Sequence, residues 1–74
     1  MILVTNNDRM GKNILTLRQR HDLSQEAFAR LVGISDGSLP AIEAGSQFEI
    51  DAQVIDRICR CFGVDVSALM EDLL

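Results

Sequence analysis

The sequence predicts a small all-α domain of five short helices. Three observations predict it: apolar residues recur at spacings of three and four, capping residues precede these runs, and glycines follow several of them. A chain of 74 residues has room for one domain with a small core. We assign residues 8–74 to that domain and residues 1–7 to an N-terminal arm. The helices are expected over about residues 8–21, 24–32, 36–44, 52–62 and 66–72.

The arm, Met1-Ile-Leu-Val-Thr5, is apolar and β-prone. It is too short for a membrane span or a signal peptide, and no basic segment precedes it. We therefore expect a cytoplasmic protein without a membrane partner. Two interpretations of the arm stay open: a flexible or loosely docked tail, or a strand that pairs with a neighbouring molecule.

The first helix is expected to be amphipathic, because Met10, Ile14 and Leu17 share one face. The second helix should start at Ser24, a good N-cap residue. Its apolar face consists of Phe28, Leu31 and Val32, and Gly33 can end it in the left-handed conformation.

A third helix is signalled by Ile34 and Ser35, which repeat the arrangement of an apolar residue before a cap. Pro40 conflicts with a helix that starts at Ser35, because it would lie in the fifth position and break a backbone hydrogen bond. With Asp36 or Ser38 as the effective cap, Pro40 falls in the first turn, where it is tolerated. We therefore predict that this helix starts late or is distorted.

The fourth helix is capped by Asp51, ends at Gly63 and buries a stripe of apolar residues. Asp65 can cap the fifth, whose apolar residues either close the monomer core or contact another subunit. We expect Val66 and Leu69 in the core. For a dimer contact we expect Met70, Leu73 and Leu74.

No metal site is expected. Cys59 and Cys61 lie two apart on a helix, so they cannot bridge each other, and we interpret them as small core residues in a reducing compartment. The only histidine, His21, lies at the end of another helix, where its positive form suits the helix dipole. A zinc site would need further ligands.

These features together resemble the Cro/C1-type helix-turn-helix family (Xre family). The resemblance covers residues 9 to 73 and is carried by the small Ala29, by Gly33 in the turn, and by apolar residues at matching positions. Those apolar positions are Phe28, Val32, Ile34, Leu39 and Ile42. The resemblance implies a five-helix, lambda-repressor-like DNA-binding domain with a central helix-turn-helix.

The resemblance also implies roles for individual residues. Arg18 and Glu43 would form an ion pair between the first and third helices. Gln25 would anchor the second helix to a phosphate. The other residues expected at the DNA are Ser35, Asp36, Gly37, Ser38, Ala41, Ser46 and Gln47. Several of them are poor base readers, because the family often has longer polar side chains there.

Charge is distributed unevenly along the chain. Residues 1–33 hold five basic and three acidic residues, whereas residues 34–74 hold two basic and eight acidic residues. The loop 46–50 carries Glu49 and no base. Fewer basic contacts to phosphate predict weaker nonspecific affinity and a shallower salt dependence.

The function implied by the resemblance is a sequence-specific DNA-binding transcriptional regulator. It would act as a repressor-like homodimer on double-stranded DNA, with the helix near residues 36–44 in the major groove. The alternative is a degenerate helix-turn-helix module in which the acidic face and Phe48 bind a protein. The sequence offers no set of nucleophile, base and orienting residue and no phosphate-binding glycine loop, so we expect no enzyme, cofactor or small-molecule ligand.

Overall fold

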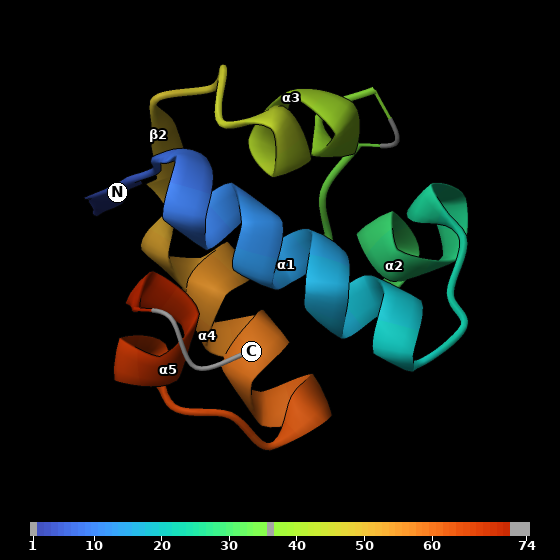
Figure 1. Ribbon diagram of the computed structural model, residues 1–74. Helices are drawn as coiled ribbons and strands as arrows, with labels where there is room; N and C mark the ends of the chain where they lie inside the picture. The colour runs from blue at the N-terminus through green and yellow to red at the C-terminus, as the bar shows by residue number, and fades with distance from the viewer. Residues whose placement is uncertain (1, 36, 72–74) are drawn as a thin grey trace.

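The five expected helices are present, together with two short strands, in the computed structural model, which describes residues 2–35 and 37–71. In chain order the elements are β1 (Leu3–Thr5), α1 (Asp8–Arg20), α2 (Gln25–Val32), α3 (Leu39–Ala44), β2 (Glu49–Asp51), α4 (Ala52–Phe62) and α5 (Val66–Met70) (Figure 1). The five-helix fold predicted from the sequence is confirmed. The largest difference in bounds is at α3, which starts at Leu39 rather than near residue 36.

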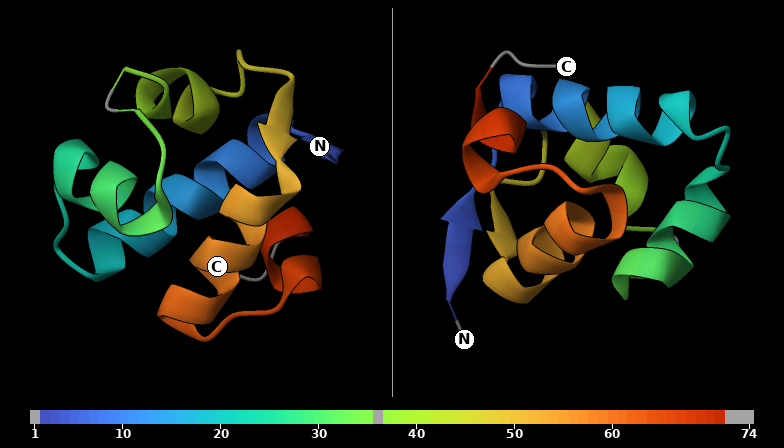
Figure 2. Two further views of the ribbon diagram at one scale, coloured as in Figure 1. Left: turned by 180° about the vertical axis from the view of Figure 1, so that it is seen from behind. Right: turned by 90° about the horizontal axis from the view of Figure 1, so that it is seen from below.

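Helix α1 crosses the middle of the molecule and organises the others around it. In Figure 1, α3 lies on one side of α1 and α5 on the other, with α2 at the C-terminal end of α1. Figure 2 shows α4 on the opposite side of the core, in contact with α2 and α5. The apolar residues from these elements form one buried cluster. Its largest fully buried side chains are Phe28, Met10, Ile14, Leu39, Ile58, Leu69 and Val32.

Two apolar residues that we assigned to buried faces are exposed. Leu31 is 51% exposed and Val66 is 45% exposed, whereas Leu69 is completely buried as expected. Both exposed residues lie on short helices in which other residues form the buried face: Phe28, Ala29 and Val32 in α2, and Leu69 in α5.

The N-terminal arm is a strand paired within its own chain, which corrects the interpretation of a loose tail, whereas pairing with a neighbouring molecule stays a prediction. Residues Leu3–Thr5 form an antiparallel pair with Glu49–Asp51 of the same chain, and Val4 lies opposite Ile50. Ile50 is buried and Val4 packs against the core. The arm is therefore held by apolar burial as well as by the hydrogen bonds of the strand pair.

The two cysteines differ from the expected pair of core residues. Cys61 is exposed and Cys59 is half-buried. Burial raises the pKa of the Cys59 thiol, with smaller contributions from Asp56 and Asp65. Across residues 2–35 and 37–71, no three or more His, Cys, Asp and Glu side chains are grouped so that they could hold a metal ion. No helix in the same part of the chain is long and apolar enough to span a membrane.

Candidate nucleic-acid interface

Helix α3 begins late, as the position of Pro40 requires. Ser38 is the residue before the helix and Pro40 is in its first turn, where a missing N–H costs no intrahelical bond. The N–H of Ile42 donates to the Ser38 carbonyl oxygen at 3.1 Å, two residues beyond the proline. The prediction of a late-starting helix is therefore confirmed.

An ion pair between Arg18 and Glu43 holds α1 against α3. The Arg18 Nε and Nη2 atoms donate to the two carboxylate oxygens of Glu43 at 2.6 and 3.2 Å, which makes the ion pair bidentate. Arg18 Nη1 also donates to the Leu23 carbonyl oxygen at 2.9 Å, and Gln25 Nε2 donates to Glu43 Oε1 at 3.1 Å. Because both charged side chains are largely buried, this cluster fixes the start of α2 relative to α3.

The expected phosphate anchor, Gln25, is part of that cluster. One N–H of its amide is already bonded to Glu43, and its side chain is half-buried at the start of α2. The second N–H and the amide oxygen have no partner among the described residues. The carboxylate of Glu43 thus orients the Gln25 amide and leaves part of it available to a ligand.

Helix α1 passes very close to α3 at Gly11. A Cβ atom at this position would lie 2.5 Å from the carbonyl oxygen of Ile42 and 2.7 Å from that of Glu43. This close crossing was not predicted from the sequence, in which the small residue singled out was Ala29, which is also fully buried. The signal was available, since a glycine inside an otherwise good helix often has a packing reason.

Two buried asparagines were also missed. The Asn6 amide nitrogen donates to the carbonyl oxygens of Ile42 at 3.2 Å and Gln47 at 2.8 Å, and so joins the arm to the end of α3. The Asn13 amide nitrogen donates to the Leu69 carbonyl oxygen at 2.7 Å and so ties α1 to α5. A polar residue among the apolar positions of α1 was the available signal for Asn13.

The expected groove residues lie together at the solvent side of α3 and its flanking turns. Ser35, Gly37 and Ser46 are exposed, while Ser38, Ala41 and Gln47 are half-buried. Asp36 lies outside the described residues.

The polar side chains of this surface are mostly bonded to the chain itself. The hydroxyls of Ser35 and Ser38 are 2.7 Å apart. Ser46 donates to the Ala41 carbonyl oxygen at 3.2 Å, and the Gln47 amide donates to the Glu49 carbonyl oxygen at 3.1 Å. Few donors are therefore free to read bases, which leaves the apolar Pro40 and Ala41 prominent on this surface.

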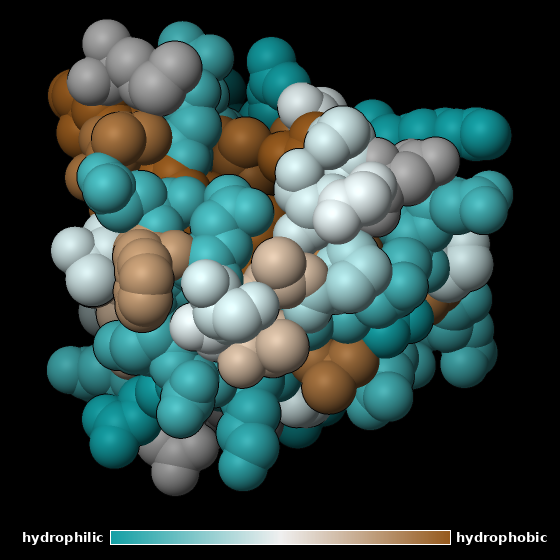
Figure 3. Space-filling view, turned by 90° about the horizontal axis from the view of Figure 1, so that it is seen from above, coloured by the Kyte–Doolittle hydropathy of each residue, from teal (hydrophilic) through white to brown (hydrophobic). Residues whose placement is uncertain are grey.

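Helix α3 contributes no exposed charge to this surface. The only charged residue in α3 is Glu43, which is buried and paired with Arg18. In Figure 3 the centre of this face is pale, of intermediate hydropathy, and hydrophilic side chains surround it. A brown, hydrophobic patch lies at one edge of this face.

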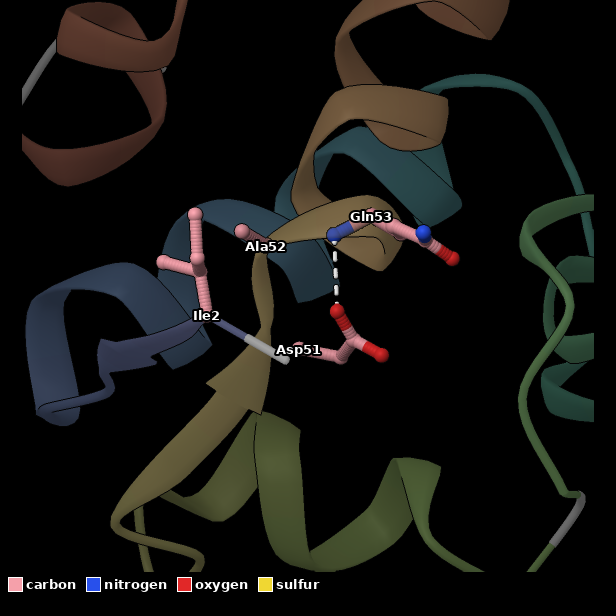
Figure 4. A pocket seen from close by; sticks show the side chains of 4 residues that line it. All are labelled: Ile2, Asp51, Ala52 and Gln53. Atoms are coloured by element: carbon pink, nitrogen blue, oxygen red, sulfur yellow. Dashed lines mark hydrogen bonds between the residues drawn. The ribbon is translucent and has the colours of Figure 1, made fainter.

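A shallow pocket lies at the far end of the strand pair, away from these residues. It is lined by Ile2, Asp51, Ala52 and Gln53 (Figure 4). Its carboxylate is used for structure, because Asp51 Oδ1 accepts a hydrogen bond from the Gln53 backbone N–H at 2.9 Å and caps α4.

Of the three expected dimer contacts, the structure describes one. Met70 at the end of α5 is 42% exposed, and Leu73 and Leu74 lie outside the described residues.

Comparisons with known proteins agree with this architecture. A family model described as helix-turn-helix matches residues 14–69. Over 55 residues, 74% of the chain, the sequence is 49% identical to the antitoxin PezA of Streptococcus pneumoniae. That stretch is 34% of PezA, so the chain spans about a third of the length of this curated relative.

Solved structures of bacterial regulators have the same fold. The N-terminal DNA-binding domain of SinR from Bacillus subtilis superposes with a TM-score of 0.78 at 21% identity, over 89% of this chain and 96% of that domain. The restriction-modification controller protein C.AhdI from Aeromonas hydrophila gives 0.73 at 22% identity, over 84% and 92%. A transcriptional regulator from Vibrio cholerae gives 0.71 at 27% identity, over 85% and 35%.

Proposed function

The chain belongs to the helix-turn-helix family of the Cro/C1 type, and from that premise we propose that it is a sequence-specific DNA-binding transcriptional regulator. In this proposal α3 enters the major groove of double-stranded DNA and Gln25 contacts a phosphate at the start of α2. The observation that carries the proposal is the cluster of Arg18, Glu43 and Gln25, because it holds the start of α2 against the last turn of α3 beside one exposed surface.

Base readout in this proposal rests on few polar atoms. Ser35, Gly37, Ser38, Ala41 and Asp36 occupy the groove, with Ser46 and Gln47 at the backbone. Pro40 and Ala41 suit apolar contact with the methyl group of thymine. Replacement of thymine by uracil in a bound duplex removes that methyl group, so it should weaken binding at the positions these residues read.

The protein would act as a repressor-like homodimer, with Met70, Leu73 and Leu74 among its subunit contacts. A dimer would place two copies of α3 in half-sites about one helical turn apart. The 49% identity with part of the antitoxin PezA supports the proposal that this chain also acts as part of an antitoxin.

Selection from a random duplex library at moderate salt tests the proposal. We expect an enriched motif, and we expect Gln25→Ala and Ser38→Ala to weaken its binding. A matched control is Gln53→Ala, an exposed glutamine on α4, which should leave binding unchanged. If no motif is enriched at micromolar protein, the proposal is wrong.

A second candidate is a protein-binding module of the same fold. Phe48 is 76% exposed and adjoins the acidic strand β2, which would suit a partner with apolar and basic groups. Absence of DNA binding, together with a partner whose affinity is lost in Phe48→Ser, would favour this candidate.

A further inference from the structure

The outer edge of β1 carries backbone groups that no described residue uses. The Ala52 N–H donates to the Ile2 carbonyl oxygen at 2.8 Å, and the Asn6 N–H donates to the Phe48 carbonyl oxygen at 2.7 Å. Because hydrogen-bonded and non-hydrogen-bonded residues alternate along an antiparallel strand, the backbone groups of Leu3 and Thr5 point to the opposite edge. Among the described residues the sheet has two strands, and in Figure 2 (right) β1 is the outer one.

Nothing in β1 itself protects this edge. Its sequence, Leu-Val-Thr, contains neither a charge nor a proline, which are the usual means of blocking an exposed strand. Leu3 is 48% exposed and the preceding Ile2 is 74% exposed. A two-stranded sheet is also marginal by itself, so a further strand would stabilise it.

We propose that this edge pairs with β1 of a second copy of the chain. An antiparallel pair centred on Val4 places Leu3 opposite Thr5 of the second copy, and Thr5 opposite Leu3 of the second copy. Leu3 and Thr5 are the residues with outward backbone groups, so this register forms four hydrogen bonds about a two-fold axis. The product is a four-stranded antiparallel sheet in which β1 strands are central and β2 strands are at the edges.

A second copy fits this edge because β1 is uncharged and its outward backbone groups are self-complementary about a two-fold axis, so the acidic character of the rest of the chain does not oppose the contact. The chain has a net charge of −4, and the neighbouring strand β2 carries Glu49 and Asp51. In the proposed sheet only the uncharged β1 strands meet, while the two acidic strands are separated by three strand spacings, about 14 Å. The apolar exposed residues Ile2 and Leu3 are covered at the same time.

The pairing would also fix the distance and orientation between the α3 helices of the two copies. The buried amide of Asn6 bonds to the Ile42 carbonyl oxygen, so β1 is held to the end of α3. Figures 1 and 2 place β1 on the same flank of the molecule as α5, which carries Met70. This inference does not depend on DNA binding, because association is measured without DNA.

Sedimentation equilibrium of the 74-residue chain tests the pairing. Thr5→Pro deletes the outward N–H but keeps the inward bonds of Val4 and Asn6, since proline is tolerated where the N–H faces away from the ladder. Each substitution counts twice in a symmetric dimer, so we expect the dimer dissociation constant to rise by at least about tenfold. Thr5→Val, which keeps the N–H, should associate like the unmodified chain, and circular dichroism should show both variants folded.

Amide hydrogen exchange locates the contact, even if Thr5→Pro does not fold. The Val4 and Asn6 amides should be protected at every protein concentration, whereas the Leu3 and Thr5 amides should become protected only as the dimer forms. The inference is overturned if the chain stays monomeric at hundreds of micromolar, or if the dimer leaves Leu3 and Thr5 unprotected. It is also overturned if Met70→Glu abolishes association while Thr5→Pro does not affect it.

Discussion

The two sides of the segment from Ser35 to Gln47 are built very differently. The inner side is fixed by buried contacts. The carboxylate of Glu43 accepts hydrogen bonds from Arg18 and Gln25, and the backbone of α3 lies against Gly11 of α1. The outer side has small residues and hydroxyls bonded to each other or to nearby backbone. The family's scaffold is therefore strongly specified in this chain, while its ligand-facing surface is not.

This difference explains why the fold and the function can be inferred with unequal detail. Buried contacts constrain residue type through packing and hydrogen bonding, so a scaffold leaves a clear pattern in the sequence. A surface that meets a ligand is constrained only by that ligand. Substitutions on the inner side should therefore reduce stability, and those on the outer side should change binding alone.

The largest expected effect comes from Glu43→Ala. It leaves the Arg18 guanidinium buried without its partner, and the Arg18 side chain is only 14% exposed. We expect the free energy of unfolding to fall by about 3 kcal/mol, measured by urea denaturation. Glu49→Ala, which removes an exposed carboxylate on β2, is the control and should change it by less than about 0.5 kcal/mol. Equal effects of the two substitutions would mean that the ion pair does not hold the scaffold.

The next largest effect is expected from a substitution at Gly11. Gly11→Ala places a methyl group against the backbone of α3, and we expect a loss of about 1–3 kcal/mol in the free energy of unfolding. Gly37→Ala is the matched control on the outer side, where an added Cβ meets nothing within 4 Å. It should change the free energy of unfolding by less than about 1 kcal/mol. If Gly11→Ala leaves the free energy of unfolding unchanged, α1 and α3 do not approach as closely as described.

Pro40→Ala should have a small effect on stability. A proline in a helix interior costs about 3 kcal/mol, but Pro40 lies in the first turn, where that cost does not arise. We expect the free energy of unfolding, measured by thermal denaturation, to change by less than about 1 kcal/mol. If Pro40→Ala instead raised the free energy of unfolding by about 3 kcal/mol, Pro40 would be shown to strain α3.

The sequence predicted the helices, the late start of α3 and most of the core, because these follow from local spacing and capping. It did not predict the pairing of β1 with β2, since two three-residue strands carry almost no periodic signal. Asn6 and Gly11 were missed for a related reason. Their roles depend on carbonyl groups of α3 that are distant in sequence.

The exposure of Cys61 and Val66 was also missed. Apolar spacing on a short helix predicts which residues share a face but not how wide the buried part of that face is. At the candidate interface, the sequence identified the neighbourhood of α3. It could not show that the serine hydroxyls and the Gln47 amide there are already bonded within the chain.

The most direct test of sequence-specific binding by α3 compares two affinities, for a library-selected duplex and for a scrambled duplex, in the unmodified chain and in Ala41→Asp. An aspartate in the first turn suits the helix dipole, so the variant should stay folded while its charge opposes the DNA. We predict that the unmodified chain prefers the selected duplex by at least about tenfold and that Ala41→Asp loses this preference. No preference in the unmodified chain, or an unchanged preference in folded Ala41→Asp, would contradict the account.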